Sequence, residues 1–348
     1  MTRSDISARR ERYAERTCRV RRTCRAGTLL TAAMAAALLA PSALGAQQSL
    51  ARRVAEVSGE AELRFASRPG VCGNGEGSIS FNSQSEGGSV SIRGRGWNYD
   101  CEPGPVRVRL TVAGGAVTRV RAYVGRARAS TSDSAFTDLG VVGAREAADF
   151  FLQLARTAGE QVARKAIVPV ALADSVTPWP QLLDVARDRG RPIEVRKPAL
   201  FWAGQIGEKN VLDAVRAMAN DASDDEAVRK QATFVLSQLP DGAGLPALLD
   251  VARNGRTTAV RKQALFWAGQ GGTSTSDLLK LYHDFEDAEL RRQTIFVLSQ
   301  RDDSASVDAL IDIAQSDPDH SMRKRALFWL GQKDDPRVMA VLTSILEK

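Results

Sequence analysis

The chain has 348 residues, of which 43% are apolar and 26% are charged, which is the composition of an ordinary globular protein. Its formal net charge is +7, but residues 1–26 hold nine arginines against Asp5, Glu11 and Glu15, so +6 belongs to this segment and only +1 to the rest. A folded part this close to neutral lacks the basic surface that phosphate backbones require, which argues against nucleic-acid binding.

Residues 1–46 have the pattern of a secretory signal peptide. A basic n-region, 1–26, precedes an apolar h-region, 28–40 (TLLTAAMAAALLA), and small residues follow up to Ala46. An apolar run of about 13 residues is short for a membrane span. We therefore expect cleavage, no membrane insertion of the mature chain, and export to the periplasm or the extracellular space. The alternative is an uncleaved signal segment, 27–46, that anchors the protein in the membrane.

Two cysteines remain after removal of this leader, Cys72 and Cys101. Exported proteins meet an oxidising compartment, and an even number of cysteines favours pairing. We expect a disulfide between them, which would close a loop of about 30 residues and contribute roughly 3–4 kcal/mol on the chain-entropy model. The alternative is two separate buried thiols.

Residues 47–142 predict a small disulfide-bonded, antiparallel β domain. The clearest unit is VRVRLTVA-GG-AVTRVRAYV, 106–124, in which two strands of period two flank Gly114 and Gly115, a strong hairpin signal. In the first of these strands Val106, Val108, Leu110 and Val112 share one face and Arg107, Arg109 and Thr111 the other, which indicates a half-buried sheet. A Ser/Thr/Asp-rich segment, 126–142, is expected to be a linker. Further short β-type runs occupy 60–67, 78–82 and 89–94.

From residue 143 to 348 the period is helical and one motif recurs. VRKPALFWAGQ begins at Val195, and related copies follow as VRKQATFVLSQ, VRKQALFWAGQ, LRRQTIFVLSQ and MRKRALFWLGQ. A second amphipathic segment precedes each copy. A repeat of roughly 30 residues containing two helices predicts a solenoid of stacked helix pairs. FW-x-G-Q and FV-x-S-Q copies alternate, which suggests duplication of a two-repeat unit. The copies begin at residues 195, 228, 260, 290 and 322.

A helical wheel of the motif places its third residue opposite the core-facing sector. These basic residues would line one surface of the solenoid. They either simply solvate the helices or form a weakly basic stripe that binds a partner. The residues are Lys197, Lys230, Lys262, Arg292 and Lys324.

The second residue of every copy is an arginine near the start of its helix, where a cation opposes the helix dipole. Carboxylates such as Glu194, Asp225 and Asp319 lie just upstream, and we expect them to pair with the arginines in a structural ladder that locks the repeats. The third copy has no upstream acid, so the ladder should weaken there. The arginines are Arg196, Arg229, Arg261, Arg291 and Arg323.

The initial Val-Arg, the small residue three positions after that arginine, and the preceding acid resemble HEAT repeats, including the HEAT-like repeats of phycobilin lyases. The resemblance covers roughly 144–348 and implies an α-α solenoid that serves as a protein-binding scaffold. Together with the leader and the strands it gives an α+β, two-domain fold class, with a small antiparallel β domain before a HEAT-like solenoid.

Catalytic chemistry has little support in the sequence. His283 and His320 lie far apart and have no partners at metal-ligand spacing, and no nucleophile or phosphate-loop motif occurs. We expect no catalytic residues, cofactor or metal, and interpret the chain as an exported, non-catalytic scaffold or adaptor that binds another protein. The alternatives are a HEAT-like lyase, or lyase subunit, acting on a prosthetic group, and a glycan- or peptide-binding β domain on a solenoid stalk.

Overall fold

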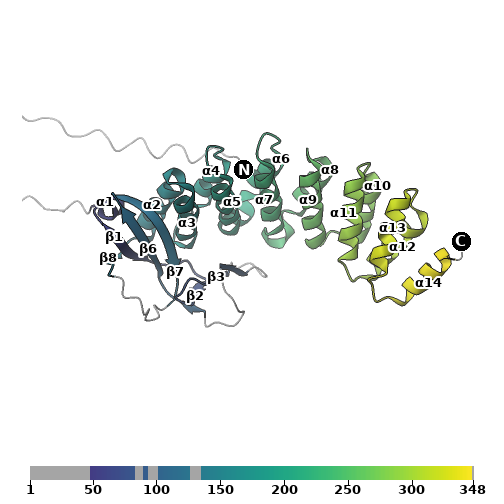
Figure 1. The fold of residues 1–348 in the computed structure, drawn as a ribbon, viewed down its shortest axis with the longest axis horizontal. Coiled ribbons are helices and arrows are strands. Elements are labelled where there is room, and N and C mark those ends of the chain that lie inside the picture. The colour runs from purple at the N-terminus through teal and green to yellow at the C-terminus, as the bar shows by residue number, and fades with distance from the viewer. Residues whose placement is uncertain (1–47, 83–88, 93–100, 126–134, 347–348) are drawn as a thin grey trace, which may run out of the picture. The chain divides into compact units, whose positions relative to one another are not determined.

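The computed structural model describes residues 48–82, 89–92, 101–125 and 135–346. The predicted leader lies outside these residues. Two small sheets are followed by a row of helix hairpins (Figure 1), so the predicted α+β fold class is confirmed. Among the described residues, no helix combines the length and the apolar character that a membrane crossing needs.

The first sheet has the strand order β7-β6-β1-β8. Strands β1 (Gly59–Phe65), β6 (Val106–Ala113) and β7 (Ala116–Tyr123) pair antiparallel, as predicted. Strand β8 (Thr137–Val141) instead pairs with β1 in parallel, so the sheet is mixed rather than purely antiparallel. Its sequence, TDLGV, shows no alternation of apolar and polar residues, which is why this part of the expected linker was not predicted as a strand.

One face of this sheet shares its core with the first helices, α1 (Leu50–Ala55), α2 (Ala144–Thr157) and α3 (Glu160–Leu172). The rings of Phe65 and Phe151 lie 6.3 Å apart. The backbone N–H of Leu50 donates to Glu146 at 2.8 Å, and that of Arg68 to the carbonyl of Leu172 at 2.8 Å. The sheet and the first helix hairpin therefore stabilise each other.

The second sheet has the order β4-β3-β2-β5, all antiparallel. It comprises β2 (Val71–Gly73), β3 (Ile79–Asn82), β4 (Ser89–Ile92) and β5 (Glu102–Pro103). The structure contains the expected disulfide, which joins Cys72 to Cys101 with their Cα atoms 5.2 Å apart. A glycine is needed at Gly73, because a Cβ there would lie 2.5 Å from the carbonyl oxygen of Val124.

The helices that follow form hairpins in which the second helix carries the repeated motif. We call these second helices the inner helices: α5 (Ile193–Gly207), α7 (Glu226–Ser237), α9 (Thr258–Gln270), α11 (Ala288–Ser299) and α13 (His320–Leu330). Each contacts the next along the row (Figure 1). The outer helices are α2, α4 (Trp179–Arg187), α6 (Leu212–Asn220), α8 (Leu245–Asn254), α10 (Thr275–Asp284) and α12 (Ser304–Ser316), and α14 (Pro336–Leu346) follows.

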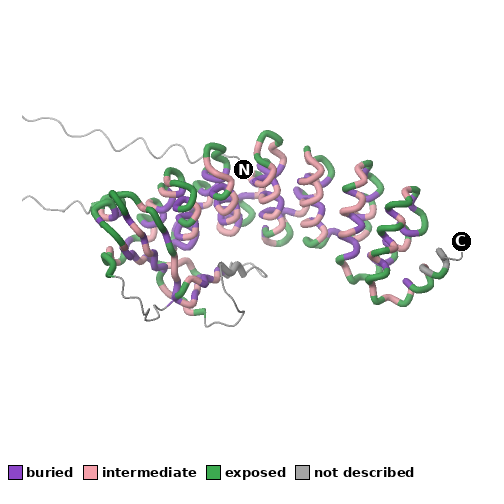
Figure 2. Tube along the Cα trace, viewed as in Figure 1, coloured by how far each residue is buried: buried purple, intermediate pink, exposed green. Residues whose placement is uncertain are grey.

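The core of the solenoid lies between the inner and outer helices, where Figure 2 shows the buried parts of the chain. The first and fifth residues of every motif copy, such as Val195 and Ala199, are buried, as the helical wheel predicts. Asp225, Asp287 and Asp319 cap the inner helices α7, α11 and α13 by accepting a backbone N–H from the first turn. Such caps typically stabilise a helix by about 1 kcal/mol.

Candidate interaction surface on the inner helices

The predicted basic stripe lies on the exposed side of the inner helices, but most of its charge is neutralised. Lys197 pairs with Glu194 at 2.9 Å and Lys230 with Glu226 at 2.8 Å. Glu289 lies between two members of the stripe and pairs with both, Lys262 at 3.0 Å and Arg292. Lys324 makes no such pair within the described part of the chain.

The glutamates of this surface remain ionised at neutral pH. The hydrogen bond from Arg292, followed by that from Lys262, lowers the pKa of Glu289, and the hydrogen bond from Lys230 lowers the pKa of Glu226. Cations and anions therefore alternate, and the surface carries little net charge over α7, α9 and α11.

Aromatic rings run beside these charges from one inner helix to the next. Phe201 stacks on Phe234 with centroids 6.1 Å apart, and Phe234 lies 5.0 Å from Trp267. The pattern repeats in the next copies, where Phe266 stacks on Phe296 at 6.4 Å and Phe296 lies 5.6 Å from Trp329. We call this set the aromatic row: Phe201, Trp202, Phe234, Trp267, Phe266, Phe296, Trp329 and Phe328.

The row begins at the second sheet, which sequence reasoning did not anticipate. Phe81 of β3 packs edge-on against Trp202, with centroids 5.9 Å apart, and Trp202 is 3% exposed. Trp267 and Trp329 occupy the same motif position but are only half-buried, and their Nε1 atoms are buried without a hydrogen-bond partner among the described residues. Burial of the tryptophan in the first copy therefore depends on the sheet.

A groove of about 400 Å³ opens on this surface between α7, α9 and α11. Phe266 contributes a half-buried ring to its wall. The side-chain amides of Gln263 and Gln293 make no hydrogen bond within the described residues. They are therefore available to a ligand, each with two donors and one acceptor. The lining residues are Lys230, Ala259, Lys262, Gln263, Phe266 and Gln293.

The predicted arginine ladder is only partly present: two of its five arginines, Arg196 and Arg291, pair with a carboxylate, and these partners differ from those expected. The Nε of Arg196 donates to the carbonyl of Ala186 at 2.8 Å, at the end of the preceding outer helix, and its Nη2 to Asp224 of the next repeat at 2.5 Å. Arg291 likewise reaches Asp317 of the next repeat. The acids directly upstream instead cap the helices, because a carboxylate there lies closest to the free N–H groups of the first turn.

For the remaining arginines of the ladder, the described residues show no ion pair with a carboxylate of the next repeat. Arg261 donates to the carbonyl of Ala252 at 3.0 Å, and Arg323 to that of Asp317 at 2.6 Å. The side chain of Arg229 is buried, and its Nε has no hydrogen-bond partner in the described part of the chain. Its repeat faces the third copy, which has no upstream acid in the sequence, but Arg261 and Arg323 also lack such a pair among the described residues, so the weakness is not confined to the third copy.

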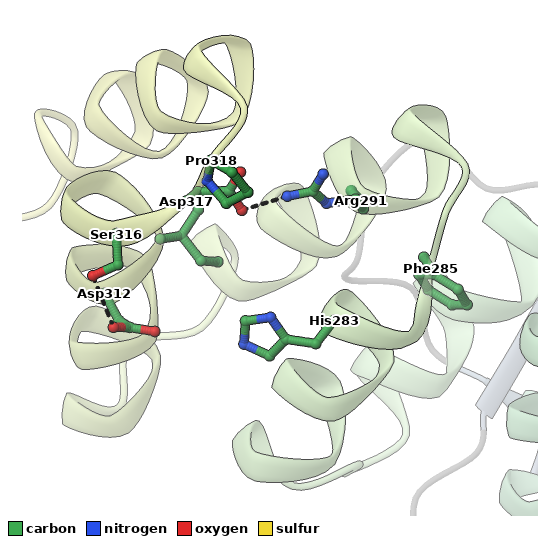
Figure 3. A pocket seen from close by; sticks show the side chains of 8 residues that line it. His283, Phe285, Arg291, Asp312, Ser316, Asp317 and Pro318 are labelled. Carbon is green, nitrogen blue, oxygen red and sulfur yellow. Dashed lines mark hydrogen bonds and ion pairs between the residues drawn. The ribbon is translucent and has the colours of Figure 1, made fainter.

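A second pocket, of about 250 Å³, opens among α10, α11 and α12 (Figure 3). Arg291 and the hydroxyl of Tyr282 both donate to the buried carboxylate of Asp317. Burial is the largest cause that raises the pKa of Tyr282, and the hydrogen bond to Asp317 raises it further. His283 points into the opening from α10 (Figure 3). Because Tyr282 and Arg291 both bond Asp317 of the next repeat, this cluster joins two repeats.

Comparisons with known proteins agree with the repeat assignment. The family model of HEAT repeats matches residues 179–268 and 275–348. No curated protein matches the chain. The solved structure of YibA from E. coli is similar over 59% of this chain and 76% of its own, with 17% identity and a TM-score of 0.38. The solved structure of human deoxyhypusine hydroxylase in complex with glycerol is similar over 57% of this chain and 77% of its own, with 18% identity and a TM-score of 0.25.

Proposed function

We propose that this HEAT-like solenoid is an exported, non-catalytic scaffold or adaptor that binds another protein through its inner helices. The observation that carries the proposal is the surface of α7, α9 and α11, where half-buried aromatic rings, free glutamine amides and paired charges adjoin one groove. Aromatic residues are enriched at protein interfaces and charged residues are depleted at interface centres, and the charges beside this groove are paired with one another.

Export is supported by the leader pattern of residues 1–46 and by the disulfide between Cys72 and Cys101, because disulfides persist in oxidising compartments. A non-catalytic role is supported by the carboxylates of the solenoid. Those with a lowered pKa, such as Asp224, Asp287 and Asp317, are held in caps and ion pairs. No observation on the described residues favours the lyase alternative.

One observation favours a second candidate function, in which the β domain binds an anionic glycan or peptide. The face of the first sheet that points away from α3 carries several arginines, and the register places Arg109 directly opposite Arg121. Arg109 is balanced by Glu62 at 3.0 Å, whereas exposed Arg119 and Arg121 have no partner among the described residues. Like charges directly opposite each other destabilise a sheet, and an anion would relieve that repulsion.

The first experiment tests the inner surface by partner capture. The mature chain from Gln47 is crosslinked in a native envelope extract and its partners are read by mass spectrometry. A five-site variant changes Lys197, Lys230, Lys262, Arg292 and Lys324 to serine. The matched control changes one exposed basic residue on each of five outer helices to serine: Arg156, Arg187, Arg216, Arg253 and Lys280.

We expect a defined protein partner that the control retains and the inner variant loses. A partner that both variants retain equally would contradict binding through the inner helices. The second candidate is tested in the full chain with Arg119→Ser and Arg121→Ser. The β domain is not tested as a fragment, because its sheet shares a core with α2 and α3 and a fragment would expose Phe65. If those two changes abolish capture while the inner variant does not, the β domain is the binding module.

A further inference from the structure

We propose that the partner inserts an aromatic side chain, carried on an uncharged, extended peptide segment, into the groove at Phe266. This inference rests on the proposed function and specifies the chemistry of the partner. The chain provides its own example of such a contact, because the strand β3 already packs Phe81 against Trp202 at the start of the aromatic row.

The groove is continuous with that internal interface. From Trp202, ring contacts lead through Phe201, at 5.4 Å, and Phe234 to Trp267, and Phe266 lies 4.9 Å further on. Trp202 and Trp267 hold the same place in motif copies two repeats apart. The first is covered by a strand of this chain and is buried, whereas the third-copy tryptophan is half-buried with the groove beside it. The second sheet thus seals one end of a surface that remains open along the following repeats.

The polar lining indicates an extended backbone rather than a helix. Gln263 and Gln293 lie at the same motif position on neighbouring inner helices and line the groove. The side-chain amide of neither residue makes a hydrogen bond within the described residues. Backbone N–H and C=O groups of a helix are already satisfied, whereas those of an extended segment need partners. Two free amides, each able to donate and accept, can bind such a backbone on either side of the inserted ring.

The charges indicate an uncharged segment. The two lysines of the groove, Lys230 and Lys262, are already paired with Glu226 and Glu289. An acidic segment would have to displace these glutamates, and a basic one would meet the ammonium groups. A phosphate-rich ligand such as RNA finds no free cation in the groove. An aromatic ring gains from burial and, beyond the buried area, from an edge-to-face or offset contact with Phe266.

The test uses a displayed library of random, linear twelve-residue peptides, selected on the immobilised mature chain. The best peptide is then synthesised, with a partner peptide in which its aromatic residue is replaced by alanine. Binding of both is measured by calorimetry to the wild type and to Ala259→Arg, in which a long side chain fills the groove without removing a core group. The matched control is Ala217→Arg, at an exposed alanine of the outer helix α6.

We expect selected peptides to share one aromatic residue and to lack net charge. Their affinity should fall at least about tenfold on removal of the ring or in Ala259→Arg, and be unchanged in Ala217→Arg. A double change, Gln263→Ala and Gln293→Ala, should also weaken binding. Failure to select any peptide, selection of peptides without an aromatic residue, or equal binding to Ala259→Arg would overturn the inference.

The outcome is separable from that of the proposed function. If the five-site inner variant loses the captured protein partner but Ala259→Arg binds it normally, binding through the inner helices is supported and insertion of an aromatic side chain at Phe266 is contradicted. If both variants bind that partner as the wild type does, both proposals are contradicted.

Discussion

Val235 packs directly against the bare backbone of Gly204, so closely that a Cβ on the glycine would overlap Cγ1 of the valine. The same relationship joins Gly269 to Val297 two repeats later. In the other copies the tryptophan of one repeat instead packs on the phenylalanine of the repeat before it, as Trp267 does on Phe234. Two kinds of joint therefore alternate, which gives the alternation of FW-x-G and FV-x-S copies a physical cause.

Replacing Gly204 by alanine should destabilise the solenoid. Forcing a methyl group into a packed core typically costs about 1–3 kcal/mol, and the better helix propensity of alanine offsets about 1 kcal/mol of that. The free energy of unfolding, measured by chemical denaturation, should fall by up to about 2 kcal/mol. Gly331→Ala is the control at the same motif position, because its nearest neighbour would be an ordinary contact at 3.6 Å. Val235→Ala should rescue Gly204→Ala, and an equal loss in both backgrounds would contradict the joint.

Providing the missing acid at the third copy should stabilise the chain. Arg256 lies four residues before Val260, the place that Asp224 occupies before Val228, and Arg229 is buried without a partner for its Nε. Arg256→Asp should raise the free energy of unfolding by about 1.5–3 kcal/mol, the range for a hydrogen bond to a charged group. In an Arg229→Met background the gain should disappear. A gain that persists there would show that the new acid acts on the helix dipole and not through Arg229.

The stability contributed by Asp317 should depend on pH in the acid range. Burial alone would raise its pKa, but hydrogen bonds from Tyr282 and Arg291 outweigh burial and lower it. A carboxyl group with a lowered pKa stabilises the fold above its ordinary pKa of about 3.9, and this contribution is lost as pH falls through the folded-state pKa. Asp317→Asn should therefore cost about 3–5 kcal/mol at pH 7, the range for breaking a buried ion pair. Its difference from wild type should shrink below about pH 4, and a constant difference across that range would refute the assignment.

Removing the disulfide should loosen the second sheet and leave the repeats intact. The bridge closes a loop with a sequence separation of 29, and its loss typically costs about 2–4 kcal/mol. In a Cys72→Ser, Cys101→Ser variant, hydrogen exchange should accelerate in β2 and β3, and exchange in α9 and α11 should stay unchanged. Uniform acceleration along the solenoid would show that the sheet supports the whole array.

Most of the fold could be predicted from local sequence patterns. The alternating strands around Gly114 and the periodicity of five motif copies identified the hairpin and the inner helices, because both depend on residues close in sequence. Strand β8 escaped prediction because its parallel pairing with β1 spans more than seventy positions, Ala61 to Thr137, and leaves no alternation. The contact of Phe81 with Trp202 likewise depends on where the second sheet packs, which no local pattern reports.

The sequence predicted where the candidate surface lies, but not all of the pairing of its charges. The helical wheel put Lys197 and its equivalents away from the core, where the structure leaves four of them partly exposed and Lys324 exposed. It could not show that Glu289 neutralises Lys262, because these two residues belong to neighbouring repeats. The same limit applies to Arg196, whose partner Asp224 belongs to the next repeat. Pairs across stacked repeats depend on the superhelical geometry of the stack, which the sequence of one repeat does not contain.

The most direct measurement is hydroxyl-radical footprinting of the mature chain with and without its captured partner, with oxidation read at each side chain by mass spectrometry. We predict that the partner protects the half-buried rings Phe234, Phe266 and Phe296, and leaves exposed Phe136 and Met339, at 39% and 68% exposure, oxidised as before. Protection confined to the β domain or the outer helices, with the three rings unchanged, would contradict binding through the inner helices.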